Sequence, residues 1–123
     1  SAFCDGNGGF YNYMTLKRKL SKDGFTDRAE VVDVTFIYEA LVLLCEIFKP
    51  KGPTNFQFRS HEGNLKLLEI NPRISSSTSI RTAFGYNESF MSVQYFLDNI
   101  IPDQPMIRKG KAIRYIEDQI VYL

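Results

Sequence analysis

Apolar and polar residues repeat along the chain with two periods, one typical of helices and one typical of strands. Within residues 34–48, apolar side chains recur three or four positions apart: Ile37, Leu41, Leu44 and Phe48. This spacing predicts an amphipathic helix, which Pro50 and Pro53 stop. A second helix is expected to begin at Asn87, a favourable capping residue, and to run to about residue 99. Its expected apolar face consists of Phe90, Val93, Phe96, Leu97 and Ile100.

The remaining segments are expected to be strands and turns. An N-terminal hairpin turns at residues 5–9, because the Asp-Gly and Asn-Gly pairs there accept positive φ. Residues 54–71 form a second hairpin, a last strand begins at Lys111, and a further strand is considered over residues 119–123. Residues 20–31 are interpreted as an irregular polar connection. This order predicts the α+β class, with an antiparallel β-sheet covered on one side by two helices.

The second hairpin gathers oxygen-bearing side chains on one patch. Glu69 and Asn71 are two positions apart, so they point to the same side of their strand. If the turn holds an odd number of residues centred on Gly63, Gln57 lies opposite Glu69 and Asn55 lies opposite Asn71. The four side chains would then share one face of one hairpin.

This patch has the chemistry of a metal and phosphate site. Hard cations such as Mg²⁺ take oxygen ligands and usually share phosphate oxygens with the protein. Arg73, just past the strand end, would complete a site for a polyphosphate and its metals. A lone Glu-x-Asn is more often part of a solvated sheet face. The complete string is more demanding, because it also fixes an Asn-x-Gln in the preceding strand, a Pro-Arg and a serine run.

Residues 52–78 resemble the metal-binding hairpin of ATP-grasp enzymes, most closely the carbamoyl-phosphate synthetase large-chain branch. The strings that carry the resemblance are Gly52-Pro-Thr-Asn55-Phe-Gln57, Glu69-Ile-Asn71-Pro-Arg73 and Ile74-Ser-Ser-Ser-Thr78. The likeness is strong over about residues 52–85 and weaker elsewhere. It implies that residues 1–123 are a fragment, the C-terminal subdomain of an ATP-grasp domain whose other part lies upstream.

The resemblance also implies a reaction and its cofactors. Family members couple a carboxylate or bicarbonate to an amine or ammonia: ATP phosphorylates the acid, and the nucleophile displaces phosphate from the acyl-phosphate. The implied cofactors are ATP and Mg²⁺, as one or two ions, with Mn²⁺ as an alternative. The fragment alone is expected to be inactive.

Each residue of the patch acquires a role through the resemblance. The implied metal ligands are Gln57, Glu69 and Asn71. Glu69, as the only carboxylate, would bind most strongly and could bridge two ions. Arg73 is the implied catalytic residue, because it would meet the transferring phosphoryl group. The implied cofactor-binding residues are Asn55, Ser75 and Ser76, and the serine run reads equally well as an ordinary helix start.

One departure from the family pattern concerns the acid. Carbamoyl-phosphate synthetases carry a histidine on the loop before the long helix, whereas residues 24–29 contain none. The chain's only histidine, His61, lies at a turn and is interpreted as ordinary surface. An amino-acid or sugar-linked carboxylate is therefore as good a candidate as bicarbonate.

Composition excludes several other classes of protein. The 123 residues carry a formal net charge of +1 with interspersed charges, so neither nucleic acid nor a membrane surface is expected as a partner. The basic run of residues 17–19 is interpreted as a solvated strand end. Cys4 and Cys45 are distant in sequence and are expected to be buried thiols in a reducing cytoplasm.

Two other readings stay open. A non-catalytic ATP-grasp relative could serve as a binding or scaffold module, although such a module has no reason to keep the whole polar set. An unrelated α+β interaction domain would require the motif string to be chance. Self-association into a homo-oligomer is also left open.

Overall fold

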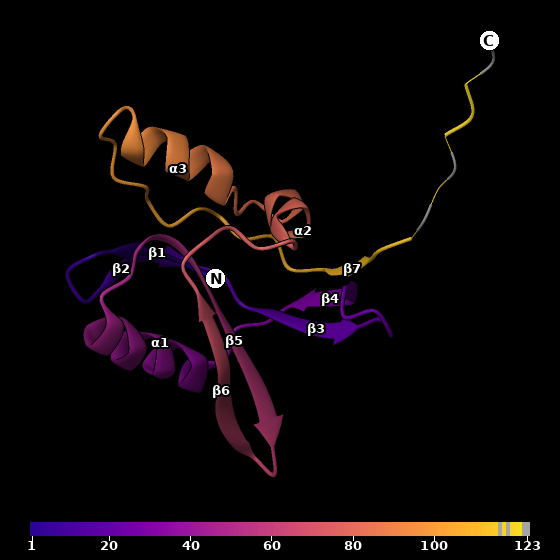
Figure 1. The fold of residues 1–123 in the computed structure, drawn as a ribbon, viewed down its shortest axis with the longest axis horizontal. Helices are drawn as coiled ribbons and strands as arrows, with labels where there is room; N and C mark the ends of the chain where they lie inside the picture. Colours follow the sequence, from indigo (N-terminus) through magenta and orange to yellow (C-terminus); the bar gives the residue numbers. More distant parts are fainter. Residues whose placement is uncertain (116, 118, 122–123) are drawn as a thin grey trace.

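The computed structural model describes residues 1–115, 117 and 119–121, with seven strands and three helices assigned among them (Figure 1). The strands are β1 (Ala2–Asp5), β2 (Phe10–Tyr13), β3 (Leu16–Leu20), β4 (Thr26–Val31), β5 (Lys51–His61), β6 (Asn64–Asn71) and β7 (Lys111–Ile113). The helices are α1 (Thr35–Phe48), α2 (Thr78–Ala83) and α3 (Glu88–Phe96). The predicted α+β class with antiparallel strands is confirmed.

The strands form two antiparallel sheets where one was expected. The larger sheet has the order β2-β1-β5-β6, and the smaller has the order β3-β4-β7. In Figure 1 the β5–β6 hairpin projects from the larger sheet, with the smaller sheet beside it. The strands β3 and β5 therefore belong to different sheets, and the candidate site lies between them.

The interpretation of residues 20–31 as an irregular connection was wrong, because this segment contains β4. The strand buries Thr26 and Ala29, which are 1 % and 3 % exposed, and presents Arg28 to solvent. The strand is rich in polar residues because one of its faces is exposed to solvent. A polar loop has a similar composition. The sequence pattern therefore could not separate the two.

The two longer helices cover opposite faces of the larger sheet, which corrects the expectation that both lie on one side. Cys4 of β1 packs in a cluster with Cys45 of α1, whereas its neighbour Phe3 packs in a second cluster with Met91 of α3. Successive strand residues point to opposite faces. Figure 1 accordingly shows α1 on one side of β1 and β2 and α3 on the other.

The predicted helix starts are close to the observed ones. Helix α1 begins one residue later than expected and has Val34 at its N-cap without a side-chain hydrogen bond. It ends at Phe48, and the C-cap residue Lys49 has a left-handed φ of 47° and donates its backbone N–H to the Cys45 carbonyl. Asn87 caps α3 as predicted, because its side chain accepts from the Phe90 N–H at 3.0 Å.

The expected apolar face of α3 was wrong. All five of its residues are at least 48 % exposed, and the buried residues of the helix are Glu88 and Met91. Glu88 forms a buried ion pair with Arg81 of α2, which turns this side of α3 inward. Phe96 still lies over the start of β5. A Cβ on Gly52 would come within 2.9 Å of its ring, so only glycine fits there with φ of 79°.

Both cysteines are free and buried, as predicted, with their sulfur atoms 3.7 Å apart. The last predicted strand is present as β7, which begins at Lys111 as expected. The further strand considered over residues 119–123 falls partly outside the described residues, and residues 119–121 are not in a strand. Within the described residues, none of the helices has both the length and the apolar character needed to cross a bilayer.

Candidate functional site

The β5–β6 hairpin pairs the predicted residues as expected. Gln57 lies opposite Glu69, and Asn55 lies opposite Asn71. Directly opposed residues on antiparallel strands point to the same face and have neighbouring side chains. The hairpin therefore gathers three carboxamides and one carboxylate on one patch.

The reason given for this register was wrong, because the turn does not have an odd number of residues. Glu62 and Gly63 alone form it, with φ of 49° and 76°, the two positive φ values of a type I′ hairpin turn. The pairing then shifts by one residue between Gln57 and Phe58, which leaves Leu68 as an extra residue on β6. This β-bulge places Glu69, and not Leu68, opposite Gln57.

Gln57 connects the hairpin to the smaller sheet. Its Nε2 donates to Glu69 Oε1, and its Oε1 accepts from Arg18 Nη2 of β3 at 3.0 Å. With the opposite amide orientation, a nitrogen would face the Arg18 donor and an oxygen would face the carboxylate. The Gln57 amide is therefore hydrogen-bonded to a cation through its oxygen and to a carboxylate through its nitrogen. To bind the same metal ion as Glu69, Gln57 would have to turn its amide oxygen toward Glu69.

Arg18 is the site residue that sequence reasoning missed, because residues 17–19 were interpreted as a solvated strand end. Lys17 and Lys19 fit that description, but Arg18 points to the opposite face of β3 and crosses to Gln57. Its Nη1 donates to Thr26 Oγ1 at 3.2 Å, and Thr26 Oγ1 in turn lies 2.9 Å from Ser77 Oγ. Burial and the charge of Arg81 lower the pKa of Arg18, while Glu69 opposes this shift. The alternation of β3 separates Arg18 from Lys17 and Lys19, but which face of β3 points to the groove depends on its pairing with β4, which the sequence does not show.

The Asn55–Asn71 pair carries unused hydrogen-bonding capacity. Asn55 Oδ1 and Asn71 Nδ2 are both buried and have no partner within the described part of the chain. Buried polar atoms normally have partners. A rotation of the Asn71 amide by half a turn would exchange its nitrogen and oxygen, so that the oxygen would occupy the position of the unpartnered Nδ2.

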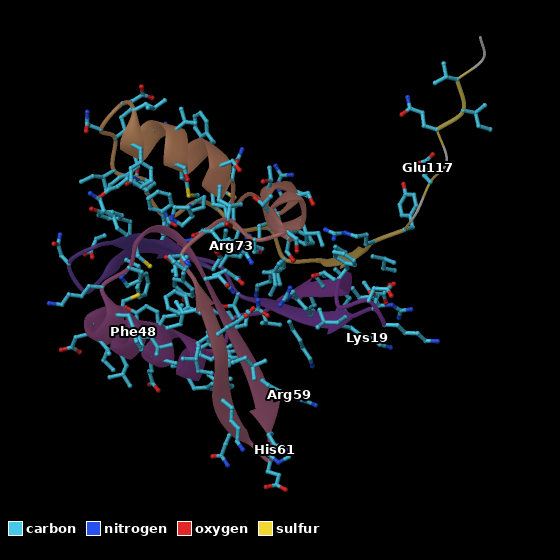
Figure 2. The ribbon with its side chains drawn as sticks, viewed as in Figure 1. Lys19, Phe48, Arg59, His61, Arg73 and Glu117 are labelled. Atoms are coloured by element: carbon cyan, nitrogen blue, oxygen red, sulfur yellow. The ribbon has the colours of Figure 1, made fainter. Side chains whose placement is uncertain are left out.

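Arg73 follows β6 on an exposed loop, at the opposite end of the hairpin from His61 (Figure 2). Its Nη1 donates to the Ile74 carbonyl at 3.2 Å. Among the described residues it has no carboxylate partner. The guanidinium is thus open to an anion. His61 is exposed at the hairpin tip, as expected for ordinary surface.

The serine run lies against a buried ion pair. Arg81 and Glu88 are 3 % and 0 % exposed, and Glu88 accepts from Arg81 Nη2 at 2.9 Å and also from its Nε. The same Arg81 Nη2 donates to Ser75 Oγ at 3.0 Å. Ser75 is buried and Ser76 is exposed. The ion pair therefore fixes the loop that carries Arg73 and the two serines.

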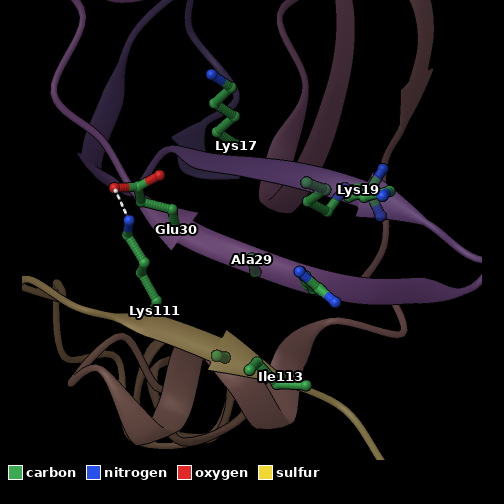
Figure 3. A pocket seen from close by; sticks show the side chains of 9 residues that line it. Lys17, Lys19, Ala29, Glu30, Lys111 and Ile113 are labelled. Carbon is green, nitrogen blue, oxygen red and sulfur yellow. Dashed lines mark ion pairs between the residues drawn. The ribbon is translucent and has the colours of Figure 1, made fainter.

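A groove of about 800 Å³ runs between β3 and the hairpin. Its polar lining includes Arg18, Asn55, Gln57, Arg59 and Arg81. A smaller concavity of about 320 Å³ lies on the open face of the β3-β4-β7 sheet, lined by Lys17, Lys19, Glu30 and Lys111 among others (Figure 3). Glu30 and Lys111 pair there at 3.5 Å, but both side chains are largely exposed. Of these two concavities, the groove is the one that combines buried polar atoms with the predicted residues.

Residues 6–119 match the family model described as ATP-grasp in the biosynthetic pathway with Ter operon. The chain belongs to this ATP-grasp family. No curated protein matches the chain. The match confirms the ATP-grasp superfamily, and it does not extend to the carbamoyl-phosphate synthetase branch. ATP-grasp domains bind ATP and typically Mg²⁺, and the family generally comprises ATP-dependent ligases.

The residues present fit an ion of this kind. The unpartnered Asn55 oxygen and the Glu69 carboxylate are hard oxygen ligands of the sort that Mg²⁺ prefers. Within the described residues, no group of three or more His, Cys, Asp or Glu side chains could hold a metal alone. An ion here would therefore need further oxygen ligands, which the phosphates of ATP can supply. The roles of Gln57, Glu69 and Asn71 as ligands stay a prediction.

Proposed function

We propose that the full-length protein is an ATP-dependent ligase resembling carbamoyl-phosphate synthetase, in which a carboxylic acid or bicarbonate is activated as an acyl-phosphate. An amine or ammonia then takes the place of the phosphate. The observation that supports this proposal is the register of the β5–β6 hairpin. It sets Gln57 against Glu69 and Asn55 against Asn71 beside an open arginine.

In this proposal, Gln57, Glu69 and Asn71 hold one or two Mg²⁺ ions, for which Mn²⁺ can substitute. When bound, Mg-ATP supplies the phosphoryl group, and the ions neutralise its charge. Glu69 contributes the only negative charge of the ligand set. Gln57 turns its amide oxygen away from Arg18 to join the ligands.

Four further residues contact ATP or its transferring phosphoryl group. Arg73 stabilises the negative charge that develops on the transferring phosphoryl group, since its guanidinium is exposed and has no carboxylate partner among the described residues. Asn55 and the serines of the following loop, Ser75 and Ser76, contact ATP. Ser75 is held for this purpose by Arg81.

We also propose that residues 1–123 are the C-terminal subdomain of a larger ATP-grasp domain. The upstream part would supply the remaining ATP contacts, so the described chain alone would not turn over. A cytoplasmic setting suits the two buried, unpaired thiols.

A phosphate-release screen of the full-length protein tests the proposal. ATP, Mg²⁺ and pairs of carboxylates and amines are supplied, and hydroxylamine is added in parallel to trap an acyl-phosphate as its hydroxamate. We expect release that depends on both the acid and Mg²⁺. If the intact protein binds Mg-ATP but releases no phosphate with any pair, the non-catalytic binding or scaffold module becomes the better reading.

A further inference from the structure

Arg18 is a half-buried cation without a carboxylate partner in the described part of the chain. Its two hydrogen-bond acceptors, Gln57 Oε1 and Thr26 Oγ1, are both neutral. Burying a charge against neutral oxygens alone is costly, and burial accordingly lowers the pKa of Arg18. The position therefore suits an anion that is supplied by a ligand.

The other cations near Arg18 do not share this property. Arg81 also lines the groove, but Glu88 neutralises it with both carboxylate oxygens. Lys17 and Arg59 also line the groove, but both side chains are exposed to solvent, and Lys19 lines the smaller concavity on the β3-β4-β7 sheet (Figure 3). Of the arginine and lysine side chains that line the groove, Arg18 is thus the one that is half-buried and has no carboxylate partner within the described residues.

The groove around Arg18 is much larger than a bicarbonate ion requires. Its volume of about 800 Å³ lies within the range of about 300–1,000 Å³ that is usual for sites of drug-sized ligands. Apolar side chains from four elements line it: Leu16 and Leu20 of β3, Phe36 and Ile37 of α1, Phe58 of β5 and Leu68 of β6. Leu20, Phe36 and Leu68 are 48 %, 51 % and 61 % exposed, so they offer uncovered apolar surface. Arg18 lies between Leu16 and Leu20 on the groove side of β3.

We propose that this groove binds the acid substrate, and that this acid is a monocarboxylate with an apolar body of several carbon atoms. The carboxylate pairs with Arg18, and the apolar body covers Leu20, Phe36 and Leu68. This inference rests on the proposed ligase function, because it places the carboxylate beside Gln57 and hence beside Glu69. It selects an extended organic acid over bicarbonate.

The test measures binding to the full-length protein without ATP or Mg²⁺, by calorimetry or ligand-observed NMR. The probes are hexanoate, acetate and hexan-1-ol. Hexanoate should bind at least about tenfold more tightly than acetate, because it buries additional methylene groups. It should bind more tightly than hexan-1-ol by a similar factor, because the alcohol lacks the charge that pairs with Arg18.

Two variants with a matched control separate the charge from the apolar lining. Arg18→Met should weaken hexanoate binding at least about tenfold, whereas Lys19→Met, on the open face of the same strand, should change it less than about twofold. Leu68→Ser should lower the preference for hexanoate over acetate without touching Arg18. Thermal melts establish that each variant is folded. If Arg18→Met does not fold, Leu68→Ser still tests the proposal.

Equal affinities for acetate and hexanoate would overturn the proposal, and so would equal effects of Arg18→Met and Lys19→Met. Weakened ATP binding in Arg18→Met with unchanged hexanoate binding would also overturn it, because Arg18 would then serve a phosphate. The measurement needs no turnover. If hexanoate binds as described but no acid supports phosphate release, the ligase function fails while the groove stands as a carboxylate site.

Discussion

Removing the charge of Glu88 should destabilise the protein strongly. The substitution Glu88→Gln keeps the shape of the side chain and leaves one carbonyl oxygen to accept from Arg81. It also leaves the Arg81 guanidinium, which is 3 % exposed, without a counter-charge. Breaking a buried ion pair by removing one partner typically costs about 3–5 kcal/mol. Since one hydrogen bond can survive, we expect a loss of about 3 kcal/mol in the free energy of unfolding.

Urea unfolding followed by circular dichroism measures this loss. The control is Glu62→Gln, because the Glu62 side chain is 82 % exposed and lies 3.9 Å from His61, so its removal should change stability by less than about 0.5 kcal/mol. The double variant Arg81→Met, Glu88→Gln removes the stranded charge and should recover at least about 1 kcal/mol relative to Glu88→Gln. A folded Glu88→Gln variant that loses less than about 1 kcal/mol would refute the reasoning, and so would a double variant that is less stable still.

Three other predictions concern the Asp5 carboxylate, the two cysteine thiols and the Arg73 guanidinium. Burial alone would raise the pKa of Asp5, but backbone N–H groups of the turn donate to its carboxylate and lower the pKa below 3.8. The resulting stabilisation is present above pH 3.8 and is lost as the pH falls through the lower folded value, so Asp5→Asn should flatten acid unfolding in this range. Cys4 and Cys45 are both 0 % exposed, so a thiol reagent should label them only after denaturant is added, and rapid native labelling would contradict their burial. Arg73→Lys should lower turnover of the full-length protein by at least about tenfold with unchanged thermal stability, because an ammonium cannot reproduce the guanidinium fork.

The sequence predicted the parts of the fold that depend on local chemistry. Asn87 caps α3 because its side chain accepts from a nearby backbone N–H, a preference that needs no tertiary contact. The apolar spacing of residues 34–48 likewise predicted which segment of the chain forms α1. The helices' placement on opposite faces depends instead on β1, whose alternate residues Phe3 and Cys4 both face apolar partners. No local pattern reveals which face a distant helix will cover.

The candidate site was predictable to a similar degree. The pairing of Gln57 with Glu69 was correct, but it arises from a two-residue turn and a bulge at Leu68, and bulges have no clear sequence signature. Arg18 was missed because its role depends on β4 lying beside β3, which sets which face of β3 points to the groove. Residues contributed by a second sheet could not be placed without the tertiary structure.

The metal-binding role of the hairpin is tested most directly by replacing Glu69 in the full-length protein. Mg²⁺-dependent phosphate release is measured for the wild type, for Glu69→Gln and for Glu62→Gln, with circular dichroism to establish the fold of each. We expect Glu69→Gln to lose at least about 10²-fold in turnover, because it removes the only carboxylate of the ligand set, while Glu62→Gln turns over like the wild type. A folded Glu69→Gln protein that releases phosphate at the wild-type rate under saturating Mg²⁺ would contradict the assignment of this hairpin.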